Sequence, residues 1–196
     1  MERLGIPYFL DEKHTILMNP FVEYLRAALS LLTENFSYES VFRYLRCGLS
    51  GISREETDLL ENYCIALGIR GWKKWQEHWV RRCRGLEEGQ VEEINGIREK
   101  FLEEIRDFAQ RMKETELTVE ERTEILYQFI VRGEMQQRLE AQKAEFDRMG
   151  EKALAGEYSQ IYGIVMELLD KIVGILGDEK ISLRDYQQIL EAGFQE

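Results

Sequence analysis

The chain has 196 residues, of which 44% are hydrophobic and 32% are charged, a composition typical of a globular protein. Its formal net charge of −11 argues against a protein that coats nucleic acid with its whole surface. No apolar run reaches the roughly 18 residues that span a bilayer, and the N-terminus lacks a secretory pattern. We therefore expect a cytoplasmic protein with no membrane partner.

The charges are divided unevenly along the sequence. Residues 1–84 hold 12 Lys and Arg against 11 Asp and Glu, so this half is nearly neutral. Residues 85–196 hold 14 against 26, a net charge of −12. We treat 1–196 as a single helical domain made of these two halves. Any surface that binds a polyanion is expected in the first half.

Proline content and helix-capping residues indicate the fold class. Pro7 and Pro20 are the only prolines, and proline breaks helix interiors, so the chain after residue 20 is predicted to be all-α. Residues 6–10, with the sequence IPYFL, form the one short extended segment. Helix caps are predicted at Asn19, Ser37, Ser53, Thr118 and Ser182. Together with the apolar spacing they predict eight or nine helices, over residues 20–32, 38–48, 54–68, 71–83, 91–112, 119–132, 135–153, 158–176 and 183–193.

The predicted helix over residues 135–153 suggests a tertiary contact. It carries an apolar stripe that Gln142 interrupts. The helix over residues 91–112 carries a longer stripe, with apolar residues spaced three and four apart. We expect these two helices to form an antiparallel pair.

The stretch GIPYFLDEKH, residues 5–14, reads like the magnesium-binding box of an ATP-driven helicase. That chemistry needs Asp11 and Glu12 beside a phosphate cradle of the form G-x-x-x-x-G-K-[ST]. No such segment occurs in the sequence. We therefore predict that the chain neither hydrolyses ATP nor cuts DNA, and that it holds no cofactor.

Candidate catalytic and metal-binding groups are not organised into a site. Glu99, Glu103 and Asp107 share one helix face, but a bundle-type di-metal site needs Glu-x-x-His twice, and His14 and His78 do not supply it. The carboxylates are read as a solvated face, and no metal site or catalytic residue is predicted. The three cysteines, without C-x-x-C spacing, suit buried thiols in a reducing compartment: Cys47, Cys64 and Cys83.

The most distinctive local feature is RGWKKWQEHWVRRCR, residues 70–84. Trp72, Trp75 and Trp79 fall at i, i+3 and i+7, which is one face of a helix. One reading is a basic, aromatic surface for DNA. The other, which aromatic stripes usually bear out, makes the tryptophans core anchors. Any contact with nucleic acid is expected through the basic cluster of Arg70, Lys73, Lys74, Arg81, Arg82 and Arg84.

Four segments resemble one known family in their order along the chain. The Gly-Ile-Pro-Tyr strand at residues 5–8 is similar to the strand that leads into the helical 2B insertion of UvrD-type superfamily 1 helicases. The full set is more similar to AddB/RexB, one of the two subunits of the bacterial ATP-dependent helicase–nuclease. The matching segments are GIPYFLD with NPFVEYLRAAL, YESVFRYLRCGL, DLLENYCIALGIRGWKKW and YQQILEAGF.

The resemblance implies a function for the chain as part of a larger protein. It implies an irregular all-α, multi-helix domain of the 2B type, cut from a subunit that works with an AddA-like motor subunit in double-strand break resection. In that family the parent enzyme uses ATP, magnesium and an iron–sulfur cluster, none of which matches a motif here. The domain is expected to be non-catalytic and to brace DNA and the partner subunit.

A second hypothesis comes from a different class of protein. The chain is then a stand-alone acidic helical adaptor that binds another protein. The full reading frame distinguishes the two, since nuclease and helicase-like segments on either side support the first.

Overall fold

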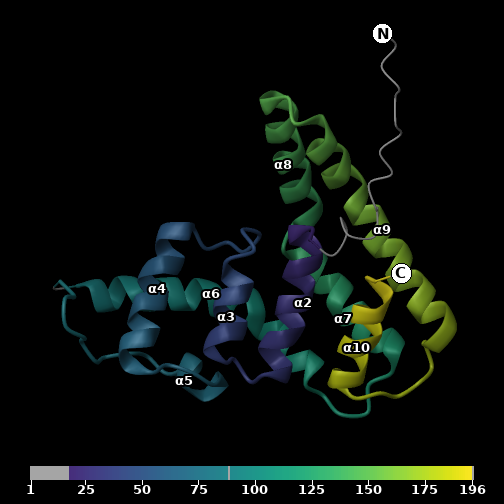
Figure 1. The fold of residues 1–196 in the computed structure, drawn as a ribbon. Helices are drawn as coiled ribbons and strands as arrows, with labels where there is room; N and C mark the ends of the chain where they lie inside the picture. The colour runs from purple at the N-terminus through teal and green to yellow at the C-terminus, as the bar shows by residue number, and fades with distance from the viewer. Residues whose placement is uncertain (1–17, 88, 196) are drawn as a thin grey trace, which may run out of the picture.

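A computed structural model of the chain describes residues 18–87 and 89–195, and these form an all-α fold, as predicted (Figure 1). The predicted extended segment at residues 6–10 lies outside the described residues. The described residues contain nine helices: α2 (Pro20–Thr33), α3 (Tyr38–Leu45), α4 (Arg54–Leu67), α5 (Trp72–Gln76), α6 (Gln90–Met112), α7 (Val119–Arg132), α8 (Met135–Met149), α9 (Lys152–Leu176) and α10 (Leu183–Gly193).

Helix α2 lies in the middle of the fold, with α3, α4, α5 and α6 on one side and α7, α9 and α10 on the other (Figure 1). Its start follows from the sequence: Pro20 occupies the first turn, and the Asn19 side chain accepts a hydrogen bond from the amide of Phe21. Ten of its 14 residues are buried. The helix packs against α3, α9 and α10, which is why it is apolar on most of its surface.

The capping residues predicted from the sequence all act as caps. Ser53 with Glu56 and Thr118 with Glu121 form complete capping boxes at the starts of α4 and α7. Ser37 and Ser182 each accept a backbone hydrogen bond at the starts of α3 and α10. Four helix starts were therefore readable from local chemistry alone.

The long helix α6 buries the predicted apolar stripe. Ile94, Phe101 and Ile105 have no exposed surface, and α6 packs against α4, α5 and α7. It runs behind α4 and α3 in Figure 1 and so connects the two sides of the molecule. Because every other element on the near-neutral side rests on α6 or α2, this helix positions the candidate site.

The predicted pairing of α6 with α8 is wrong, because α8 packs chiefly against α9. Helices α8 and α9 form a hairpin that projects from the rest of the fold (Figure 1). The predicted helix boundaries at 153 and 158 also differ from the structure. Gly150 adopts a left-handed conformation with φ of 81°, which ends α8 and turns the chain into α9. Phe146 and Tyr158 then face each other across the hairpin, with ring centroids 5.1 Å apart.

A short extended contact joins the start of α7 to the segment between α9 and α10. Thr118 forms an antiparallel bridge with Lys180, and the amide of Val119 donates to the carbonyl of Glu179 at 2.9 Å. The buried Arg122 donates to the carbonyls of Met112, at 2.9 Å, and Ile181. These bonds hold the segment between α9 and α10 against the start of α7.

Along residues 18–87 and 89–195, none of the helices is both long and apolar enough to cross a bilayer.

Candidate nucleic-acid interface

Residues 70–84, here called the basic segment, are not one helix, contrary to the prediction. Helix α5 covers only Trp72–Gln76, and the chain is extended at Glu77. Side chains take over the hydrogen bonds that would continue the helix. The carbonyl of Lys74 accepts from the indole Nε1 of Trp79 at 2.8 Å, and the carbonyl of Trp75 accepts from Nη1 of Arg98 at 2.7 Å. Both carbonyls are thus satisfied without a further turn.

Two of the three tryptophans of the basic segment are core residues, in agreement with the second interpretation. Trp75 and Trp79 are 1% and 5% exposed and meet edge to face, with centroids 5.2 Å apart. Trp79 also stacks on Tyr63 at 5.3 Å. Trp72 is half-buried against Phe36, with its ring centroid at 4.5 Å. Since two of the three indoles lie in the core, they offer no face to a nucleic-acid base.

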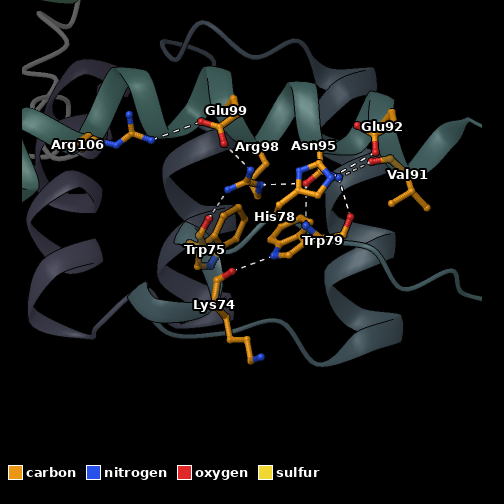
Figure 2. A network of polar contacts seen from close by, with 10 residues as sticks. All are labelled: Lys74, Trp75, His78, Trp79, Val91, Glu92, Asn95, Arg98, Glu99 and Arg106. Carbon is orange, nitrogen blue, oxygen red and sulfur yellow. Dashed lines mark hydrogen bonds and ion pairs between the residues drawn. The ribbon is translucent and has the colours of Figure 1, made fainter.

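Asn95 on α6 binds the basic segment as a neighbouring strand would (Figure 2). Its Oδ1 accepts from the amide of Trp79 at 3.0 Å, and its Nδ2 donates to the carbonyl of Trp79 at 2.8 Å. Nδ2 also donates to the carbonyl of Val91 at 3.0 Å, within α6 itself. One buried amide group therefore pairs both main-chain groups of Trp79 and fixes where the segment leaves α5.

Arg98 completes this network from one turn further along α6. It is 2% exposed, donates to Trp75 and to Oδ1 of Asn95, and lies 5.6 Å from the centre of the Trp79 ring. Glu99 accepts from the same guanidinium, so the buried charge has a carboxylate partner. We call the pair Asn95 and Arg98 the α6 clamp.

Sequence reasoning missed the α6 clamp, although a signal for it existed. Arg98 falls on the buried face of α6, four residues after Ile94 and three before Phe101. An arginine at such a position must satisfy several donors at once, and nearby main-chain carbonyls are the available acceptors. The pattern pointed to a buried network, but not to the segment that it holds.

All six cations of the predicted basic cluster are exposed. Lys74 extends away from α6 in Figure 2 and pairs with Glu77 at 2.9 Å. The carbonyl of Arg81 accepts from the hydroxyl of Tyr63 at 2.7 Å, which anchors the main chain and leaves the guanidinium outside. Within the described residues, five of the cluster's members form no ion pair: Arg70, Lys73, Arg81, Arg82 and Arg84.

Two of the three carboxylates considered for a metal site, Glu99 and Asp107, take part in ion pairs. Glu99 contacts Arg98 and Arg106, and Asp107 contacts Arg132. Across residues 18–87 and 89–195, His, Cys, Asp and Glu side chains form no group of three that could hold a metal ion.

Cys64 is buried, and Cys47 and Cys83 are half-buried. Burial raises the pKa of the Cys47 thiol to about 12, and the same effect raises the pKa of Cys64. Cys47 also donates to the carbonyl of Arg43 at 3.2 Å. Two of the three thiols are therefore held in the protonated form, as expected of core cysteines.

Comparison with known proteins places the whole chain within longer relatives. It is 38% identical over 199 residues to the AddB/RexB subunit of the ATP-dependent helicase/deoxyribonuclease from Lachnoclostridium phytofermentans, covering 100% of this chain and 17% of that protein. It is 42% identical over 202 residues to the protein of the same name from Clostridium botulinum strain Loch Maree, covering 98% of this chain and 17% of that protein. No family model matches.

The relative from Caldanaerobacter subterraneus, with the same name, is 38% identical over 98% of this chain, and the chain again spans 17% of its length. These matches extend through the middle of the sequence, beyond the four segments that carry the resemblance. The resemblance predicted from those segments is thus confirmed over the entire chain. Along its whole length, the chain corresponds to one segment of the AddB/RexB family of ATP-dependent helicase/deoxyribonuclease subunits, to which it belongs.

Proposed function

We propose that the chain is a non-catalytic helical domain of the AddB/RexB subunit of an ATP-dependent helicase/deoxyribonuclease, and that its basic segment contacts the DNA backbone. The observation that carries the proposal is the outward placement of six cations on a segment that the α6 clamp holds in place. Residues 70–84 contain one acidic residue, Glu77, on a chain whose net charge is −11. A local cation cluster on an acidic protein directs a polyanion to one face.

The buried indoles favour duplex backbone over single-stranded bases. Binding of single strands relies on aromatic side chains that stack on successive bases. Trp75 and Trp79 already stack within the core. The exposed groups of the segment are guanidinium and ammonium groups, which bind phosphate without reading sequence. Binding should therefore be sequence-blind and weak, with Kd on the order of 10⁻⁴ to 10⁻⁶ M near physiological salt.

The remaining roles in this proposal belong to the parent protein. The relatives are about six times as long as the chain, since it covers 17% of their length. We place ATP and magnesium binding, the iron–sulfur cluster and the nuclease in the rest of that subunit or in an AddA-like motor subunit. In this proposal the domain braces the motor subunit and DNA in the cytoplasm, during double-strand break resection and recombinational repair.

The test of DNA contact is a titration of a labelled duplex at low salt with charge-reversal variants. The test variant combines Lys73→Glu, Arg81→Glu and Arg82→Glu. The control variant combines Lys152→Glu, Lys171→Glu and Arg184→Glu, three exposed cations of the acidic half that form no ion pair within the described residues. Both triples change the net charge equally.

We expect the test variant to lose at least tenfold in affinity and the control to lose less than threefold. Each phosphate contact contributes a slope of about −0.9 to the dependence of log K on log salt, so the test variant should also show a shallower slope. Equal affinities of the two variants would exclude the basic segment as the DNA contact.

The absence of catalysis is tested separately. The purified chain should show no magnesium-dependent ATP turnover and no DNA cleavage. ATP turnover that disappears with Asp11→Ala and Glu12→Ala would overturn the non-catalytic assignment.

A further inference from the structure

A groove runs between α7 and α9, on the acidic half and away from the basic segment. The two helices pack side by side (Figure 1), and the space between their outer faces has a volume of about 670 Å³. Two kinds of residue line it, an apolar set at the bottom and an acidic set at the edges. The lining residues are Glu120, Glu121, Thr123, Glu124, Tyr127, Met166, Leu169, Asp170 and Val173.

The floor of the groove is apolar and partly open. Leu169 is buried at the bottom, Met166 and Val173 are half-buried beside it, and the ring of Tyr127 is 43% exposed. Val131, one turn beyond Tyr127 on α7, is 50% exposed and extends the apolar surface along the same helix face. Contiguous exposed apolar surface of this kind, rimmed by polar groups, marks an interaction site more often than scattered apolar residues do.

The edges of the groove carry four carboxylates and no cation. Glu120, Glu121 and Glu124 lie on α7, and Asp170 lies across from them on α9. Within the described residues, none of the four forms an ion pair, in contrast to the carboxylates on α6. Glu124 accepts only from the neutral amide of Gln128, and Glu121 from the amide of Thr118. The groove therefore concentrates negative charge, with no cation among its lining residues.

We propose that this groove binds a basic amphipathic helix of a partner protein. Apolar side chains of that helix, spaced three and four apart, would rest on Met166, Val173 and Tyr127, and flanking Lys or Arg would meet the carboxylates. This is the helix-in-groove mode of recognition. The rim repels DNA and other polyanions. A second copy of this chain is a poor occupant, because it carries a net charge of −11.

The inference does not depend on the DNA contact proposed above. The groove and the basic segment share no residue and lie on different helices. A failure of the duplex titration leaves the groove untouched, and a failure of the groove test leaves the basic segment untouched.

Two synthetic helical peptides and backbone amide chemical shifts test the proposal. One 18-residue peptide carries leucine along one face and lysine on both flanks, and the other replaces each lysine by glutamate. The test variant combines Glu120→Lys, Glu124→Lys and Asp170→Lys. The matched control combines Glu93→Lys, Glu103→Lys and Glu140→Lys, which likewise changes one first-turn and two mid-helix carboxylates and adds the same charge.

We expect the lysine peptide to shift amides of α7 and α9 around the groove, and the glutamate peptide to leave them unchanged. The test variant should bind the lysine peptide at least tenfold more weakly than the control variant. Equal weakening in both variants would show attraction to net charge alone and would overturn the proposal. Shifts confined to other helices, or self-association of the chain that Tyr127→Glu abolishes, would also overturn it.

Discussion

Two buried arginines, one on α6 and one on α7, perform related tasks with different surroundings. Arg98 on α6 and Arg122 on α7 are 2% and 3% exposed. Arg98 donates to the main-chain carbonyl of Trp75 near the end of α5, and Arg122 donates to the main-chain carbonyls of Met112 and Ile181. Arg98 has a carboxylate partner in Glu99 and the face of Trp79 beside it. Arg122 donates only to carbonyls and approaches the sulfur of Met112 at 3.9 Å.

The difference between the two sites explains what each arginine stabilises. Burial lowers the pKa of Arg122 from its ordinary value, yet a guanidinium remains protonated throughout the physiological range. Its carbonyl partners, Met112 and Ile181, end α6 and precede α10, so Arg122 closes a junction of helices. Arg98 instead holds a surface segment whose cations face outward. The same chemistry thus closes a helix junction at Arg122 and supports a segment with exposed cations at Arg98.

The largest effect is expected for Arg122→Ala. The change removes the side-chain donor from the carbonyls of Met112 and Ile181 and leaves a cavity at the junction, so we expect a loss of about 4 kcal/mol in the free energy of unfolding. Urea denaturation measures it. Arg132→Ala, on the same helix but exposed and paired with Asp107, should cost less than about 1 kcal/mol. Similar losses in the two variants would contradict the role given to burial.

For Arg98→Ala we expect a smaller loss in the free energy of unfolding, about 3 kcal/mol. The loss is smaller because Oδ1 of Asn95 still accepts a hydrogen bond from the Trp79 amide after Arg98 is removed. The distinguishing readout is hydrogen exchange, which should accelerate at the Trp79 amide more than in α7. Arg106→Ala, which removes the exposed arginine on Glu99, serves as the control and should change stability by less than about 1 kcal/mol. Unchanged hydrogen exchange at the Trp79 amide would contradict the role of the α6 clamp in holding the basic segment.

The two capping boxes provide a matched pair, one in each half. Ser53→Ala and Thr118→Ala each remove a hydroxyl that accepts a hydrogen bond from a helix amide. Each should lower the free energy of unfolding by about 1 kcal/mol, measured by thermal or urea unfolding. Thr118 also lies in the bridge to Lys180, but that bridge uses main-chain atoms, so the two losses should agree within about 0.5 kcal/mol. A much larger loss for Thr118→Ala would mean that the junction depends on this side chain.

The smallest effect is a pH dependence at Glu56. Lys100 and the amide of Ser53 lower the pKa of this carboxyl below its ordinary value. A carboxylate with a lowered pKa in the folded state stabilises above its unfolded pKa, and the contribution disappears as the pH falls through the folded value. Glu56→Gln preserves the cap, so the variant should be less stable by about 0.5 kcal/mol at pH 7 and equal to the native chain near pH 3. A constant difference at both pH values would contradict the ionic origin.

The fold was largely predictable because most helix starts are set by local chemistry. Five residues act as the N-caps that the sequence predicts: Asn19, Ser37, Ser53, Thr118 and Ser182. The apolar spacing of α6 likewise identified its buried face. These signals depend on neighbours within one or two turns, which a sequence displays directly.

The predictions that were wrong concern features that depend on groups distant in sequence. The helix expected over residues 71–83 stops at Gln76 because Arg98, more than 20 residues away, takes the carbonyl of Trp75. The partner of α8 was misassigned because the turn at Gly150 brings α9 back along it. The exposure of the six cations followed from their chemistry, whereas their common support on the α6 clamp required the fold.

Our central proposal is that the basic segment, held by the α6 clamp, contacts DNA. The most direct test is backbone amide chemical-shift mapping of the native chain with a short duplex at low salt. The account predicts shifts concentrated in residues 70–84 and in the adjoining turn after α4, diminishing as salt is raised. Shifts spread over α7 to α10, or none in residues 70–84 while the duplex binds, would contradict it.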